Sequence, residues 1–109
     1  MTRISTPWGF ADQVYPLGPD AFSVSTPSHG GIKITSEALA RLPVIWRATA
    51  YSKGGWFEED CDWCIPYLAL RLDRFEADPA RGVKSLESAR QTFRTWLNGD
   101  PATIEGCAT

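Results

Sequence analysis

The sequence predicts an α+β fold, in which a three-stranded antiparallel meander packs against two or three helices. Two observations indicate this fold class. Apolar and polar residues alternate within residues 10–35, as they do in half-buried strands. Farther along the chain, apolar residues recur every three or four positions, as on the buried face of a helix. The 109 residues fit a single domain, 1–109.

The predicted strands are separated by recognisable turns. The segments FADQVYP (10–16) and AFSVST (21–26) flank LGPD, which has the Gly, Pro and Asp of a tight turn. The segment GIKIT continues the alternation after the loop PSHGG (27–31), with its two isoleucines facing inward. Because the connections are short, consecutive strands are expected to run antiparallel.

Helices are expected at about residues 36–42, 57–76 and 85–98. The first follows a Thr-Ser pair that can supply the N-cap, and it stops before a proline. The last begins after Ser85 and closes with Asn-Gly, a common C-terminal cap. Residues 102–109 are expected to form a loose tail.

The helix at 57–76 has the strongest helical periodicity in the chain. Its first turn holds Glu58, Glu59 and Asp60, where the helix dipole favours negative charge. Pro66 should kink the helix, unless the helix begins later and the proline falls in its first turn. The predicted buried stripe consists of Phe57, Cys61, Cys64, Ile65, Leu68, Ala69, Leu72 and Phe75.

The charge is unevenly distributed. The formal net charge of −2 divides into +2 for residues 1–56 and −4 for residues 57–109. No basic stripe is present, so direct binding to nucleic acid is not expected, whereas the acidic half suits a basic partner. Five tryptophans are many for this length, and tryptophan serves both cores and interfaces.

A cytoplasmic location is expected, with no membrane association. No apolar run approaches the roughly 18 residues that span a bilayer, and the N-terminus has no apolar region typical of a secretory signal. In a reducing cytosol, free thiols are the default.

The pair Cys61 and Cys64 has the spacing of a redox motif, but its surroundings disfavour redox chemistry. Four acids lie among and beside the two cysteines, and negative charge raises a thiol's pKa. Both cysteines fall on the predicted buried stripe, where cysteine behaves as a small apolar residue. We therefore expect structural thiols.

No metal site is expected. A Cys3His zinc set could be drawn from His29, Cys61, Cys64 and Cys107, but zinc sites of this kind usually need two paired clusters. The acids at positions 58, 59, 60 and 62 could attract a hard cation. Because neighbours on a helix do not face each other, these carboxylates are not expected to converge.

The loop around His29 is the leading candidate for a binding surface, with residues 51–56 as the second choice. Gly30 and Gly31 would allow close approach of another backbone, although a purely structural turn also explains them. A hydrolase of the His-Gly-Gly type would need a longer chain and a Gly-x-Ser-x-Gly elbow.

Two segments, VSTPSHGGIKIT and GWFEEDCDWCIPYLAL, resemble a group of small uncharacterised domains carried by bacteriophages, plasmids and other mobile elements of proteobacteria. The shared pattern is a TPSHGG loop (26–31) and an aromatic-Glu-Glu-Asp-Cys helix start (57–61). The resemblance covers residues 8–75 and leaves the last helix outside. Its pattern has no second cysteine at position 64, which speaks against a family-wide thiol chemistry.

The resemblance implies a context rather than a reaction. Small proteins of mobile elements often inhibit host defence, so we expect a non-enzymatic binding protein without a cofactor, most concretely an anti-CRISPR protein that blocks by bulk or charge in the host cytosol. The expected partner is a host protein or ribonucleoprotein complex. The expected partner-binding residues are His29, Gly30, Gly31, Trp56, Glu58, Glu59 and Asp60.

Two alternatives stay open. One is a small metal- or thiol-dependent enzyme that uses His29 with Cys61 or Cys64. The other is a structural or regulatory homo-oligomer, such as a homodimer, with exposed tryptophan at the self-interface.

Overall fold

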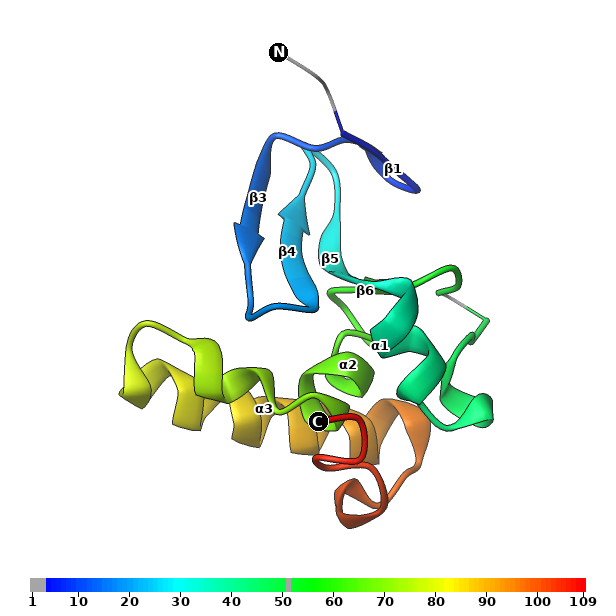
Figure 1. Cartoon of the computed structure of the whole chain (residues 1–109), viewed down its shortest axis with the longest axis vertical. Coiled ribbons are helices and arrows are strands. Elements are labelled where there is room, and N and C mark those ends of the chain that lie inside the picture. The colour runs from blue at the N-terminus through cyan, green and yellow to red at the C-terminus, as the bar shows by residue number, and fades with distance from the viewer. Residues whose placement is uncertain (1–3, 51) are drawn as a thin grey trace.

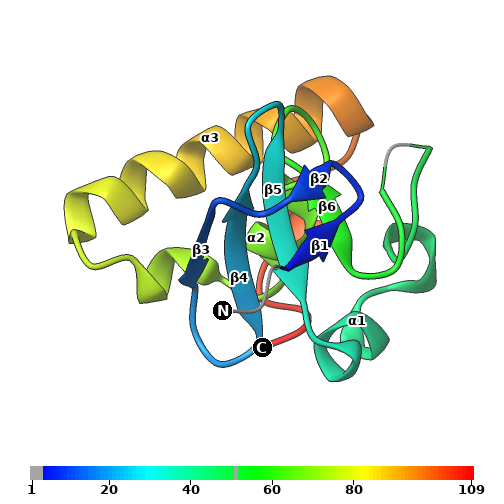
Figure 2. The same ribbon diagram turned by 90° about the horizontal axis from the view of Figure 1, so that it is seen from above.

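A computed structural model of the chain describes residues 4–50 and 52–109 and confirms the α+β class. Its main sheet and the helices α2 (Cys64–Ala69) and α3 (Pro79–Leu97) form two layers, with α1 (Ser36–Arg41) following the sheet on one flank (Figure 1). The core lies between these layers. A separate two-stranded hairpin, β1 (Ser5–Thr6) and β2 (Gly9–Phe10), lies over the side of the sheet that faces away from the helices (Figure 2). We call this side the outer side.

The main sheet has four antiparallel strands, where the sequence predicted three. Their order is β3 (Gln13–Pro16), β4 (Ala21–Ser25), β5 (Gly30–Ile34) and β6 (Trp56–Glu58). The first three are the predicted meander. The fourth occupies the start of the segment that was predicted to be a helix.

The predicted helix at 57–76 is therefore wrong in its first third. Phe57 is fully buried and lies opposite Ile32 of β5, whereas its neighbours Trp56 and Glu58 are only half-buried. This alternation is that of a strand. The glycines at 54 and 55, with φ of 67° and 84°, form the tight turn that leads into the strand.

Helix α2 is short and begins only at Cys64. Pro66 is its third residue, where no intrahelical backbone hydrogen bond is lost, so the predicted kink is absent and the alternative of a later start is confirmed. The 3₁₀ helix η2 (Leu72–Phe75) continues the chain. The apolar periodicity that indicated one long helix thus spans a strand, a turn and two short helices.

The other two helices match their predictions more closely. In α1 the side chain of Thr35 accepts a hydrogen bond from the Ala38 N–H, as expected for an N-cap. Helix α3 begins at Pro79, six residues before the predicted start, because Asp78 caps it and the proline suits a first helical position. It ends at Leu97, and Asn98 adopts the left-handed conformation of a C-terminal cap.

The expected loose tail at 102–109 is wrong. After the 3₁₀ helix η3 (Pro101–Thr103), the side chains of Ile104 and Ala108 are buried in the core. The N–H groups of Gly106 and Ala108 donate to the carbonyls of Leu68 and Ala69, each at 2.9 Å. The tail is therefore hydrogen-bonded to carbonyl groups in the last turn of α2.

The tryptophans divide between core and surface. Trp46 packs edge-on against the fully buried Phe93 with ring centroids 5.0 Å apart, and Trp63 packs against Tyr67. Trp96, by contrast, is 63% exposed on α3. No helix within the described residues has the length and apolar character needed to cross a bilayer.

Candidate functional site

Pairing of β5 with β6 brings the two predicted binding segments together. Gly31 lies opposite Glu58, and Lys33 lies opposite Trp56. The ladder continues one step past β6, where the Glu59 N–H donates to the Gly30 carbonyl at 2.9 Å. All seven residues predicted to bind a partner therefore lie on two adjacent stretches of backbone.

Strand alternation divides the run of acids between the two sides of the sheet. Because Phe57 faces the core, Glu58 faces the outer side. Glu59 points to the helix side, where its Oε2 lies close to Gly30. The carboxylates of Glu58 and Glu59 therefore lie on opposite sides of the sheet.

His29 joins two of these acids. One nitrogen of its imidazole and one carboxylate oxygen each from Glu58 and Asp60 lie within 4.8 Å of one another. Asp60 comes from the turn after β6, and His29 directly precedes β5. The prediction that the carboxylates would not converge rested on a helix, and it is wrong for Glu58 and Asp60 because the segment is a strand followed by a turn.

The backbone that carries His29 is held by Thr26. The Thr26 N–H and hydroxyl both donate to the His29 carbonyl at 2.7 Å, and the His29 N–H donates to the Thr26 hydroxyl oxygen at 3.1 Å. The histidine side chain itself is exposed. Its position is thus set by the loop, while the imidazole remains available to an external ligand.

Gly30 and Gly31 accommodate the protein's own chain. A Cβ atom at Gly31 would lie 2.0 Å from the Phe57 carbonyl oxygen and 2.7 Å from the Trp8 ring. A Cβ at Gly30 would lie 2.9 Å from the Val24 carbonyl oxygen. Both glycines are buried. The space that the sequence suggested for a partner holds β6 and Trp8 at Gly31, and the β4 backbone and the Glu59 carboxylate at Gly30.

Trp56 and Lys33 form a small cluster beside these glycines on the outer side. The Trp56 ring meets Trp8 edge-on at 5.8 Å, and the Lys33 ammonium lies 4.9 Å from the Trp56 centroid. That ammonium also donates to the Gly54 carbonyl at 2.8 Å, and burial lowers the Lys33 pKa. Of the second predicted loop, 51–56, residue 51 lies outside the described part of the chain.

The two cysteines of the Cys-x-x-Cys motif are core residues. Cys61 is 5% exposed and Cys64 is fully buried. Burial, and after it the charge of Asp62, raise the pKa of Cys61 to about 11 and that of Cys64 to about 12. Both thiols are therefore protonated at neutral pH and are poor nucleophiles. Among the described residues His29 clusters with carboxylates instead of with these thiols.

Asp62 is a further acid, and it lies apart from the outer-side cluster of His29, Glu58 and Asp60. Its carboxylate is fully buried, and one oxygen accepts a hydrogen bond from the Thr49 hydroxyl. Its Oδ1 atom has no hydrogen-bond partner among the described residues. Asp62 thus joins the packing around the cysteines and is not available to the solvent.

Thiol titration should separate the three cysteines. We expect Cys107, which is exposed, to react with a disulfide reagent in the native protein, whereas Cys61 and Cys64 react only after unfolding. The reaction can be followed by absorbance with and without denaturant. Equal rates for all three thiols in the native protein would contradict their placement.

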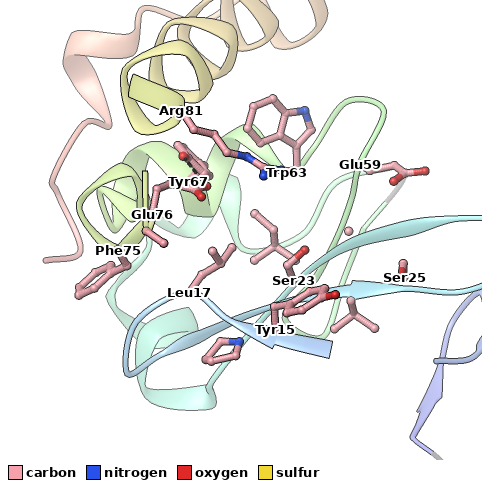
Figure 3. Close-up of a pocket in the computed structure, with 15 residues that line it drawn as sticks. Tyr15, Leu17, Ser23, Ser25, Glu59, Trp63, Tyr67, Phe75, Glu76 and Arg81 are labelled. Carbon is pink, nitrogen blue, oxygen red and sulfur yellow. Dashed lines mark hydrogen bonds between the residues drawn. The ribbon is translucent and has the colours of Figure 1, made fainter. Parts of the chain in front are cut away.

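A groove of about 690 Å³ lies on the helix side of the sheet, between the β3–β4 region and the start of α3 (Figure 3). Glu59 and Trp63 line one part of it, and Arg81 extends from α3 toward Trp63. The Tyr67 hydroxyl donates to Glu76 at 3.1 Å, and burial raises the Tyr67 pKa. Sequence reasoning missed this groove because its lining comes from distant segments that share no motif.

Comparison with known proteins places the chain in a family. A family model described as a domain of unknown function, DUF7007, matches residues 1–109. None of the curated proteins and none of the solved structures compared with the chain matches it. The expectation of an uncharacterised family is thus confirmed. The chain belongs to the DUF7007 family of domains of unknown function.

Proposed function

We propose that this protein is a binding protein that inhibits a host defence complex from within the host cytosol, most concretely an anti-CRISPR protein. One observation carries the proposal: the pairing of β5 with β6 gathers the two segments of the mobile-element resemblance at one end of the sheet. His29 and Asp60 are exposed there, and Trp56 and Glu58 are half-buried beside them. A surface built on paired strands is rigid, which reduces the entropic cost of binding.

The chemistry of this surface suits a basic partner. Glu58 and Asp60 place two carboxylates near each other on the outer side, and the second half of the chain has a net charge of −4. Complementary charge increases the rate of encounter and suppresses wrong partners. The partner would be a protein or ribonucleoprotein surface that normally holds nucleic acid, and the carboxylates would take the place of phosphates.

Charge reversal tests this proposal. We expect Asp60→Lys and Glu58→Lys to weaken capture of the partner by at least about tenfold, because like charges facing each other at an interface cost several kcal/mol. Binding of purified protein to host CRISPR effector complexes, measured at two salt concentrations, provides the readout. Higher salt should also weaken binding by the unmodified protein, because salt screens the attraction between charges.

The matched control for these variants is Glu87→Lys. The Glu87 side chain is 65% exposed on α3 and forms only a surface ion pair with Arg90, so its reversal makes the same charge change away from the surface. Equal binding by Asp60→Lys, Glu58→Lys and the unmodified protein would refute the proposed binding surface. If the unmodified protein binds none of the effector complexes, the anti-CRISPR assignment is refuted.

A homo-oligomer is the second candidate function. It is favoured by the exposed side chains of Val83 and Trp96 on α3, which are 70% and 63% accessible. Tryptophan is enriched at the centres of protein interfaces. Light scattering at two protein concentrations, with Trp96→Ser for comparison, distinguishes a monomer from a dimer.

A further inference from the structure

We propose that His29, Glu58 and Asp60 bind one divalent transition-metal ion on the outer side of the sheet. The inference does not rest on the proposed partner binding, although it uses the same Glu58 and Asp60 side chains. The sequence suggested a metal set of His29 with cysteines, whereas the structure pairs the same imidazole with two carboxylates.

The geometry is set by strand pairing. Glu58 lies on β6 opposite Gly31 of β5, and His29 lies two residues before that glycine. Two residues are one full period of a strand, so His29 returns to the side that Glu58 faces. The donor atoms of the three side chains, including Asp60 from the following turn, then fall within 4.8 Å of one another.

The backbone on both sides of the cluster is fixed. Thr26 makes three hydrogen bonds with the His29 backbone, and the Ser52 hydroxyl accepts from the Glu58 N–H at 3.1 Å. The three side chains therefore start from an ordered backbone when their donor atoms close around an ion. A site whose backbone is already ordered loses less entropy on binding.

The charges of the two carboxylates also favour a bound cation. Two carboxylates this close repel each other, and within residues 4–50 and 52–109 neither forms an ion pair with Lys, Arg or His29. Lys33, the cation opposite Trp56 on β5, is engaged with the Gly54 carbonyl and the Trp56 ring. A bound divalent ion would neutralise the pair.

The donor set indicates the class of ion. An imidazole nitrogen suits Zn²⁺, Fe²⁺ or Ni²⁺ better than Mg²⁺ or Ca²⁺, and carboxylates are accepted by Zn²⁺ and Mn²⁺. Three protein ligands leave at least one coordination position open, as in catalytic rather than structural zinc sites. Because His29 and Asp60 are exposed, that position faces solvent and can take water or an anionic group.

Direct titration with metal tests the inference. The untagged full chain with Cys107→Ser, which removes the exposed thiol, is titrated with Zn²⁺ by calorimetry. We expect saturation at one ion per chain. Loss of an outer-shell partner typically weakens metal affinity by about 10- to 100-fold, so His29→Gln, Glu58→Gln and Asp60→Asn should each weaken it at least as much.

Glu59→Gln is the matched control, because it removes the neighbouring carboxylate, which faces the other side of the sheet. It should leave the affinity unchanged. An equal loss in Glu59→Gln and Glu58→Gln, or unchanged binding in His29→Gln, would show diffuse attraction to acids and overturn the site.

A second measurement needs no substitution among the proposed ligands. His29 is the only histidine in the chain, so its ring resonances are unambiguous in an NMR spectrum. Substoichiometric Mn²⁺ should broaden them selectively, together with the backbone signals of Glu58 and Asp60. Absence of broadening there, or absence of saturable Zn²⁺ binding, overturns the inference. Because no partner is involved, this result is distinguishable from failure of the proposed partner binding.

Discussion

Replacing Gly31 with alanine should lower the free energy of unfolding by about 3 kcal/mol, the upper part of the usual range for overpacking a filled site. The added methyl group would lie 2.0 Å from the Phe57 carbonyl oxygen, which belongs to the backbone of β6, and 2.7 Å from the Trp8 ring. A backbone atom cannot rotate away as a side chain can. Strand β6 must therefore shift from β5, and urea unfolding measures the loss.

The matched control for this substitution is Gly54→Ala. Nothing lies within 4 Å of a Cβ at Gly54, so only its left-handed backbone, with φ of 67°, opposes the alanine. That strain costs about 1 kcal/mol. If Gly31→Ala is no more destabilising than Gly54→Ala, then β6 and Trp8 do not pack over Gly31. A shifted β6 would also separate Glu58 from His29, so Gly31→Ala should weaken Zn²⁺ binding as well.

Replacing Ile104 with alanine should cost about 2–5 kcal/mol of stability, as is usual when a large aliphatic side chain is removed from a core. Ile104 is fully buried although it lies only five residues before Thr109. The backbone that follows it is hydrogen-bonded to the carbonyl groups of Leu68 and Ala69 at the end of α2. Loss of this anchor should loosen α2 together with the tail, and chemical denaturation provides the measurement.

Cys107→Ala is the control for the tail. Cys107 is exposed, and surface substitutions usually change stability by no more than about 0.5 kcal/mol. Comparable stability of Ile104→Ala and Cys107→Ala would support the loose tail that the sequence predicted and contradict the buried one.

The meander and α1 could be predicted because their signals are local. Alternation over residues 21–34 and the Gly-Pro-Asp turn specify strands whose partners are adjacent in sequence. The cap of α1 is a contact between Thr35 and a residue three positions later. Such features need no knowledge of the rest of the fold.

Strand β6 could not be recognised by periodicity, because its three residues are too few for an alternating pattern. Phe57, Cys61 and Cys64 are all buried, but they are buried on a strand, in a turn and on a helix, and their spacing imitates one helix by coincidence. A usable signal was the Gly-Gly pair at 54 and 55, which is favoured in two-residue hairpin turns.

The candidate site depends on a contact that is distant in sequence. His29 meets Glu58 and Asp60 only because β6 pairs with β5 across a connection that includes α1. Each residue was singled out in the sequence for partner binding, but their convergence follows from strand register. The same register explains why Glu59, between the two acids, faces the other side.

The pairing of β5 with β6 is the central claim, and proton–proton contacts measured by NMR test it most directly. The account predicts cross-strand backbone contacts between Gly31 and Glu58 and between Lys33 and Trp56. A helix that begins at Phe57 would instead give contacts from Phe57 to Asp60 and none across to β5. That second result would contradict the strand, the convergence of His29 with the two carboxylates, and the binding site built on it.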